Sequence, residues 1–303
     1  DQVGDVVDQI IKTGKATSSL HSGVIDFGIN KLPVLEKDPT DRNRTSPFAF
    51  TGNRFEFRMV ASSNSIGDTN TVLSAMMAEA FADAIDALTG AEDLDKAVEE
   101  YTVKLMREHE RIIFNGNGYS DEWPIEAEKR GLPNCKSIVD AIPALTSEST
   151  IEMYKNCKVL SERELQAREE ILFEQYAGVR NIEALTMVDI ANKMLIPTAV
   201  KYTGKLADTI LAVKEAGVEP TVQTELLAEV TDKLNEMKDA TKALAEITEK
   251  AANAGDVQAV ANAYKDDVMA AMAALRKPAD ELEVIMPKSM WPMPTYGDLL
   301  FEL

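Results

Sequence analysis

The sequence is poor in several residue types that build particular kinds of site. It has two cysteines, two histidines and 6% aromatic residues in 303 positions. Cys135 and Cys157 are too few for a disulfide scaffold and lack a metal-binding spacing, so they indicate a reduced, cytoplasmic setting. We expect both cysteines to be packing residues. His21 and His109 are expected to be surface or packing residues.

Basic residues are also scarce. The 32 lysines and arginines stand against 51 aspartates and glutamates, which gives a formal charge of −19. Nucleic acid and anionic membranes would repel such a chain, so neither is expected as a partner. No run of about 18 apolar residues occurs, as a membrane span would require. The chain begins at Asp1 with neither an initiator methionine nor a basic and apolar leader, which suggests a cytoplasmic piece of a longer protein.

The apolar residues that are present, 45% of the chain, follow helical spacing over most of its length. A chain of 303 residues exceeds the usual domain size of roughly 100 to 200 residues, so two regions are expected. Apolar residues recurring at three and four positions predict helices, each with one apolar face to be buried. The predicted helical segments are 3–11, 70–88, 94–114, 121–130, 162–202, 227–244 and 257–275.

The second half of the chain is predicted to be a small bundle. Two antiparallel helices are expected to pack against the long helix at 162–202, which has only Pro197 late in it. Gly255 is suited to end one of these helices and Asp256 to cap the next. The proline-rich tail at 286–296 is expected to be extended and docked on a surface.

Two segments near the N-terminus have the alternation of strands. Residues 23–29, which include two glycines, alternate between apolar and small or polar residues. Residues 48–59 form two further alternating runs, joined by a short loop at Gly52 and Asn53 as in a β-hairpin. In the second run, period two places Arg54, Glu56 and Arg58 on one face and the aromatic residues on the other. We expect the aromatic face to pack on a core, which leaves the charged face toward a cleft or solvent.

The charged face allows two interpretations. A carboxylate between two guanidiniums suits an anion site with a metal, because Glu56 offers oxygen ligands for Mg²⁺ or Mn²⁺ while Arg54 and Arg58 can hold phosphate or carboxylate. The same pattern also fits a solvated face with cross-strand ion pairs. The turn cluster at 115–118 lacks the flanking residues of a phosphate loop, so we expect a structural turn.

A resemblance to a known protein family decides between these two interpretations. Asn43-Arg44-Thr45, followed by Arg54-Phe55-Glu56-Phe57-Arg58, resembles the glutamine synthetase sequence Asn-Arg-Ser/Thr and then Arg-x-Glu-x-Arg near the end of the catalytic domain. The string at 40–59 closely resembles the type III version. The segments 114–120, 130–134 and 291–296 match as well, so the resemblance spans most of the chain.

The resemblance implies a fold that is α+β and predominantly helical. Residues 1–145 would be the distal part of a glutamine synthetase catalytic domain, with a few strands plus helices. Residues 146–303 would be a helical C-terminal extension, an antiparallel helical bundle with a docked proline-rich tail. Homo-oligomeric rings with active sites between neighbouring subunits are implied for the full-length enzyme.

The resemblance also implies the activity: glutamine is made from glutamate, ammonia and ATP by way of a γ-glutamyl phosphate, with Mg²⁺ or Mn²⁺. By position, Glu56 resembles the divalent-metal ligand and Arg54 the arginine along the ATP phosphates. Arg44 resembles the catalytic arginine that stabilises the transferred phosphoryl group, and Arg58 the one that holds glutamate. Many family members carry a further phosphate-binding arginine where this chain has Ala49.

The remaining metal, adenine and ammonium ligands of the family lie upstream of this pattern, and none can be placed in residues 1–40. One metal ligand and a few arginines cannot bind three substrates tightly, so we expect the isolated chain to be inactive. The alternative hypothesis is a non-catalytic helical assembly or interaction module, in which the strand charges only form ion pairs.

Overall fold

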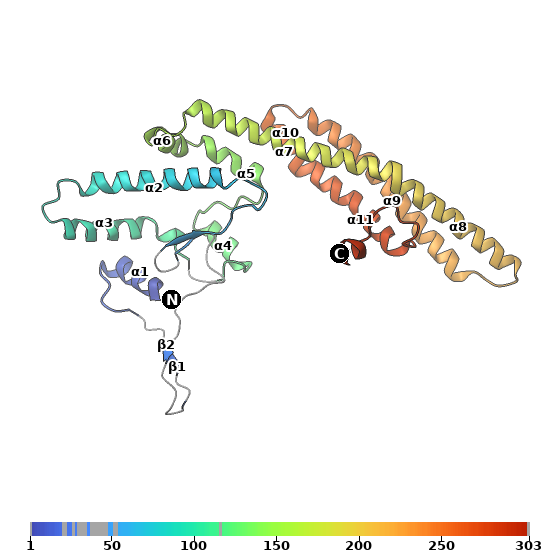
Figure 1. Cartoon of the computed structure of the whole chain (residues 1–303), viewed down its shortest axis with the longest axis horizontal. Helices are drawn as coiled ribbons and strands as arrows, with labels where there is room; N and C mark the ends of the chain where they lie inside the picture. The colour runs from blue at the N-terminus through green and yellow to red at the C-terminus, as the bar shows by residue number, and fades with distance from the viewer. Residues whose placement is uncertain are drawn as a thin grey trace. The chain divides into compact units, whose positions relative to one another are not determined.

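The chain's structure is a computed structural model (Figure 1). It describes residues 2–19, 23–25, 28, 35–36, 48–50, 54–114 and 117–301. They form two units, the first made of Asp1–Lys136 and Glu148–Ser161 and the second of Ser137–Ser147 and Glu162–Leu303. Helices dominate both, which confirms the predicted α+β, predominantly helical class. Among the described residues, no helix is both long and apolar enough to cross a membrane.

The first unit contains five helices and two short antiparallel ladders within its described residues. The helices are α1 (Gln2–Thr13), α2 (Ile66–Leu88), α3 (Leu94–Glu108), α4 (Glu122–Lys129) and α6 (Glu148–Asn156), with a 3-10 turn at Glu110–Ile112. The strands are β1 (Val24–Ile25) with β2 (Leu35–Glu36), and β3 (Phe48–Phe50) with β4 (Phe55–Phe57). The helices predicted at 3–11, 70–88 and 121–130 are confirmed, and the one predicted at 94–114 ends earlier, at Glu108.

Capping residues set where the long helices of this unit begin. The Ser65 side chain accepts a hydrogen bond from the backbone N–H of Gly67 at 3.1 Å, and Asp93 accepts one from Lys96 at 3.1 Å. Both residues therefore satisfy an N–H group that has no partner inside the helix. α2 and α3 follow these caps and lie side by side as a hairpin (Figure 1).

The expected burial of the apolar face of α2 is wrong for the described residues. Ala75 is the one residue of α2 that is buried, at 3% exposed, while Phe81 is 60% exposed. The physical reason is that the neighbours of α2 in this unit, α3 and α6, leave most of the stripe uncovered.

The second unit is an antiparallel helical bundle, as predicted. Its elements are α5 (Ile138–Ala141), a 3-10 turn (Ile142–Thr146), α7 (Glu162–Ile190), a π turn (Ala191–Leu195), α8 (Ile196–Glu215), α9 (Thr221–Ala252), α10 (Val257–Ala263), a π turn (Tyr264–Val268), α11 (Met269–Ile285) and α12 (Tyr296–Phe301). In Figure 1, α9 runs back along α7 and α8, and α11 returns beside it.

The core of the bundle follows the apolar repeat of α9. Six residues of α9 are at most 3% exposed and recur at three, four or seven positions: Val230, Met237, Thr241, Leu244, Thr248 and Ala251. They contact buried residues of α8 and α11, among them Leu206 and Leu275. The two threonines donate their hydroxyls to carbonyls one turn earlier, at 2.7 Å each, so both of these buried hydroxyls have an acceptor.

The long helix runs further than predicted. The sequence pattern gave an end near Tyr202, whereas α8 continues to Glu215 and stops before Gly217, which has a φ of 78°. Pro197 does not stop the helix because it lies in the first turn of α8, just after the π turn. Proline has no N–H, and the wider i to i+5 turn absorbs the lost hydrogen bond.

The junction between α9 and α10 has the predicted chemistry. Gly255 has a φ of 137°, a conformation that other residues rarely adopt. The Asp256 carboxylate then accepts a hydrogen bond from the N–H of Ala259 at 2.8 Å and starts α10.

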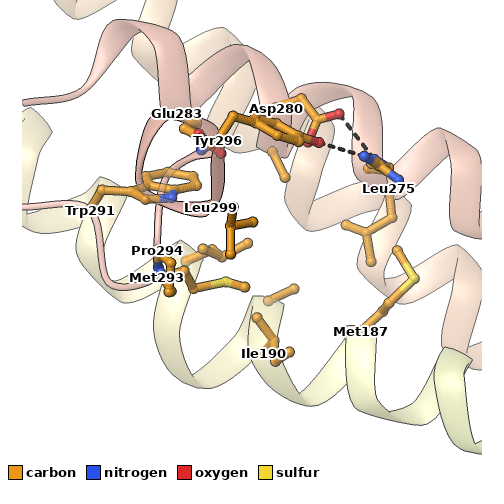
Figure 2. Close-up of a pocket in the computed structure, with 14 residues that line it drawn as sticks. Met187, Ile190, Leu275, Asp280, Glu283, Trp291, Met293, Pro294, Tyr296 and Leu299 are labelled. Atoms are coloured by element: carbon orange, nitrogen blue, oxygen red, sulfur yellow. Dashed lines mark hydrogen bonds and ion pairs between the residues drawn. The ribbon is translucent and has the colours of Figure 1, made fainter. Parts of the chain in front are cut away.

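The proline-rich tail lies against α7 and α11 and ends in the short helix α12. Met286 is 4% exposed, and Trp291 packs on the same apolar cluster. Between the tail and the two helices lies a cavity of about 330 Å³ (Figure 2). Met187 and Ile190 of α7 line one side of it, and Trp291 of the tail the other.

Polar contacts fix the tail at the rim of this cavity. The Tyr296 hydroxyl accepts a hydrogen bond from Arg276 and lies 3.3 Å from an oxygen of Asp280, and the Tyr296 N–H donates to Glu283 at 2.8 Å (Figure 2). The tail at 286–296 therefore contains turns and leads into the helix α12, in place of the extended conformation expected from its prolines.

The Asp298 carboxylate also holds the tail, because it binds two other residues. It forms an ion pair with Lys288, and it accepts hydrogen bonds from the N–H and the hydroxyl of Thr295 at 3.0 and 2.9 Å. These interactions, with the Lys288 hydrogen bond the strongest, lower the pKa of Asp298 to about 2.

We expect acid to loosen the tail. Because the folded pKa of Asp298 is below its ordinary value of 3.8, the stabilisation is complete above pH 3.8 and is lost as the pH falls toward about 2. The fluorescence of Trp291, measured in a Trp123→Phe background, should report the change. Asp298→Asn should lose this pH dependence between pH 4 and 2. Superimposable acid titrations of the two proteins would contradict this role.

Candidate functional site

The predicted hairpin at 48–59 is present. β3 and β4 pair antiparallel, with Phe48 opposite Phe57, Ala49 opposite Glu56 and Phe50 opposite Phe55. The connecting residues 51–53, including the predicted Gly52-Asn53 loop, lie outside the described residues. This register places Glu56 in the middle of β4, with its side chain on the face opposite the two phenylalanines of the same strand.

The charged face brings two of the four predicted site residues into contact. Arg58 Nη2 lies 3.2 Å from Glu56 Oε2, and the two side chains are 28% and 45% exposed. Arg54 is exposed and precedes β4 directly. Arg44 lies outside the described residues, as does the whole segment 37–47. The structure therefore describes the positions of Arg54, Glu56 and Arg58.

The aromatic face of the hairpin does not pack on a core within the described residues, contrary to expectation. Phe48 stacks on Phe55 with ring centroids 5.1 Å apart and meets Phe57 edge-on at 6.3 Å. Phe55 is nonetheless 59% exposed and Met59 is 67% exposed. The reason is geometric: a ladder of two strands covers neither of its own faces, and further strands or helices are needed to bury one.

The described residues offer Glu56 as a single side-chain ligand for a divalent cation on this face. None of them form a group of three or more histidines, cysteines, aspartates or glutamates that could hold a metal. Mg²⁺ is commonly bound by one or two carboxylates together with water and phosphate oxygens, so one carboxylate fits part of such a site and not a whole one. The ion pair with Arg58 is no obstacle, because an exposed pair contributes only about 0 to 1 kcal/mol.

The described part of the cluster at 115–118 lies in a turn, as expected. Residues 115–116 lie outside the described residues, and the rest of the turn is held internally, with the Tyr119 N–H bonded to Asn117 Oδ1 at 3.2 Å. The sequence did not predict the aromatic contacts beside this turn. Phe114 stacks on Trp123 with centroids 3.9 Å apart, and the Arg130 guanidinium lies 5.7 Å from the Trp123 ring.

The cysteines and histidines play no part in a described site. Cys157 is half-buried, with its sulfur 3.6 Å from the Ala75 carbonyl oxygen, as expected of a packing residue. Cys135 is exposed, so its predicted packing role is wrong. It lies two residues after Pro133, in the irregular segment before α5. His109 is exposed at the end of α3, as expected, and His21 lies outside the described residues.

Comparison with known proteins gives the context for this hairpin. A family model described as the glutamine synthetase C-terminal domain matches residues 97–214. A type-3 glutamine synthetase of Dictyostelium discoideum is 32% identical over 91% of the chain, and a glutamine synthetase of Butyrivibrio fibrisolvens is 37% identical over 89%. Over most of its length the chain is similar to glutamine synthetases.

The match concerns one portion of these enzymes. A glutamine synthetase of Bacteroides fragilis is 30% identical over 99% of the chain, and that alignment covers 43% of the relative. The other two relatives are covered to 39%. The chain thus spans about two fifths of the length of the curated relatives it matches, and the matching family model describes a C-terminal domain.

Proposed function

We propose that this chain is the C-terminal portion of an ATP-dependent glutamate–ammonia ligase and that β4 forms one wall of its active site. The observation that supports the proposal most directly is the Glu56–Arg58 pair on the exposed face of β4, in a chain related to glutamine synthetases. Residues 1–145 would belong to the catalytic domain, and residues 146–303 would be the helical extension with its docked tail.

The charged face suits the chemistry of forming a γ-glutamyl phosphate. Transfer of a phosphoryl group to a carboxylate gathers negative charge in one place, and arginines and metal ions placed beforehand stabilise it. In the proposed roles Glu56 supplies one ligand to Mg²⁺ or Mn²⁺, and Arg54 lies along the ATP phosphates. Arg44 stabilises the transferred group, and Arg58 binds the glutamate carboxylate as a charge-assisted pair.

The contact at 3.2 Å between Arg58 and Glu56 supports a mechanism in which each group exchanges its partner when substrate binds. When glutamate and a divalent cation are both present, Arg58 gains the substrate carboxylate as partner and Glu56 gains the cation. Because the exposed pair is weak, breaking it costs little compared with the charge-assisted bonds that replace it. In the proposed cytoplasmic, ring-forming enzyme, the remaining ligands come from outside this chain.

The isolated chain is expected to show no γ-glutamyl transfer with Mg²⁺ or Mn²⁺, because Glu56 is its one described metal ligand on this face. In a full-length enzyme that carries this chain, Arg58→Ala should raise the KM for glutamate roughly tenfold or more, as expected for the loss of a hydrogen bond to a charged group. The kcat should change less.

Arg107→Ala is the matched control, because Arg107 is an exposed arginine of α3 that is remote in sequence from the motif. It should leave both kinetic constants unchanged. Robust turnover by the isolated chain, or an unchanged KM in Arg58→Ala, would count against the proposed function.

A further inference from the structure

The cavity between the tail and the helices α7 and α11 has the size and composition of a small-molecule site. Its volume is about 330 Å³, and most of the residues that line it are apolar. Ligand sites in proteins are usually apolar concavities of roughly 300 to 1,000 Å³ with a few polar groups that orient the ligand. We call it the tail cavity. Its apolar wall includes Ile190, Leu195, Leu275, Met293 and Leu299.

The apolar wall favours an apolar occupant over water. A buried water molecule needs two to four polar partners, and aliphatic side chains offer none. An engineered cavity of about 150 Å³ with a comparable lining stays dry and binds benzene. The tail cavity, at about 330 Å³, has roughly twice that volume. An aromatic ring with a short chain attached therefore fits it.

The irregular turn of the long helix lies at this cavity. Ala191 and Leu195, the first and last residues of the π turn, both line it. Such turns are rare within helices and frequently mark functional sites. Met187 of α7 and Met293 of the tail also line it, and methionine side chains adapt readily to the shape of a ligand. Both features favour a ligand site over a packing defect.

The polar side of the cavity has a carboxylate whose charge is not neutralised within the described residues. Figure 2 shows Asp280, Glu283 and Tyr296 together on this side. Asp280 forms an ion pair with Arg276 at 3.1 Å and also accepts the Tyr296 hydroxyl at 3.3 Å. Glu283 accepts an uncharged N–H, that of Tyr296, at 2.8 Å, and no described lysine or arginine forms an ion pair with it. A cation is therefore favoured beside Glu283.

Two aromatic rings favour a cation at the same place. Trp291 and Tyr296 both line the cavity, and the face of an aromatic ring attracts an ammonium group. The formal charge of −19 also concentrates cations around the chain. A carboxylate ligand would meet Glu283, and it could pair with Arg276 only in competition with Asp280.

We propose that the tail cavity binds a small organic amine with an aromatic body. The ammonium group pairs with Glu283 beside Trp291 and Tyr296, and the body lies against Ile190 and Leu195. Because the tail supplies part of the wall, the bound amine holds the tail on α7 and α11. The site belongs to the helical bundle alone and does not depend on the proposed activity.

A pair of matched ligands tests the proposal. Phenethylamine has an aromatic ring and an ammonium group, and phenylpropionate has the same ring and chain with a carboxylate in its place. Each is titrated at neutral pH and constant ionic strength into the full chain carrying Trp123→Phe, and binding is followed by Trp291 fluorescence and by calorimetry. Phenethylamine should bind saturably and at least about tenfold more tightly than phenylpropionate, as expected for a hydrogen bond between charged groups.

Three variants locate the binding. Glu283→Gln should weaken phenethylamine binding at least about tenfold, while the glutamine oxygen can still accept the Tyr296 N–H and keep the tail docked. Glu246→Gln is the matched control, because it removes an exposed carboxylate of α9 and the same unit of charge. It should leave binding unchanged. Ala279→Phe adds a ring at the wall of the cavity and should abolish the binding of both ligands.

Three results would overturn the proposal. The first is an absence of saturable phenethylamine binding, and the second is phenylpropionate binding that is as tight or tighter. The third is an equal effect of Glu283→Gln and Glu246→Gln, which would reduce the selectivity to the overall charge of the chain. Circular dichroism shows whether each variant has folded. Glu283→Gln, which keeps the size of the side chain, tests the site even if Ala279→Phe fails to fold.

Discussion

Replacing Leu244 by alanine should lower the free energy of unfolding of the bundle by about 2 to 5 kcal/mol. Leu244 is 0% exposed in the middle of α9, where it belongs to the cluster shared with α8 and α11. The substitution removes the transfer free energy of the buried side chain and leaves a cavity that rigid neighbouring helices cannot fill. Few other single changes in this chain should cost as much.

Urea unfolding followed by Trp291 fluorescence, in the Trp123→Phe background, measures this effect in the unit that contains Leu244 and Trp291. The signal reports the bundle and not the first unit, which matters because a chain with two units need not unfold in one step. Val222→Ala is the control, because Val222 lies on the same helix and is 71% exposed. It should change the free energy by less than about 0.5 kcal/mol. Equal midpoints for the two variants would show that the α9 repeat is not the core.

In a full-length enzyme, Glu56→Ala should weaken the binding of the metal–nucleotide complex at least about tenfold to hundredfold. Substitution of groups that only support metal ligands already costs that much, and a direct ligand contributes no less. The change also leaves Arg58 without the carboxylate that lies 3.2 Å away, so local positive charge rises where a cation should bind.

The measurement is the dependence of activity, and of nucleotide binding by calorimetry, on the concentration of Mg²⁺ or Mn²⁺. Glu100→Gln provides the comparison, because Glu100 is an exposed carboxylate of α3. Metal dependence that is unchanged in Glu56→Ala would favour the alternative hypothesis, in which the strand charges form ion pairs only and the chain is a helical assembly module.

Much of this fold could be predicted from residues that lie close together in the sequence. The repeat around Leu244 predicted a buried helix face, and the pair Gly255 and Asp256 predicted a helix end and a new cap, because each depends on residues close in sequence. The alternation around Glu56 likewise predicted a shared face with Arg58, and their contact shows that face directly. These features need no knowledge of distant neighbours.

The features that could not be predicted depend on what lies beside an element. The apolar stripe through Phe81 looks the same in sequence as the buried stripe of α9, and periodicity alone does not say whether a partner is present. In the strand β4, alternation likewise did not reveal that Phe55 is exposed. The tail around Tyr296 folds into a turn and a helix because Arg276, Asp280 and Glu283 of α11 bind it, which are contacts that prolines in the sequence do not reveal.

The π turn at Ala191–Leu195 affects how the long helix formed by α7 and α8 tolerates changes in length. Ala184 and Ala191 keep a seven-residue repeat, whereas Ala191, Leu195 and Ala199 are spaced by four and four, a stutter in the heptad pattern. The wide turn absorbs the surplus angle, so Leu206 still points into the seam with α9. A π turn holds one residue more than an α-helical turn, so deleting one residue here should restore a regular helix and leave the later side chains in phase. Deleting one residue from the regular part of α7 would instead rotate every later side chain by about 100°.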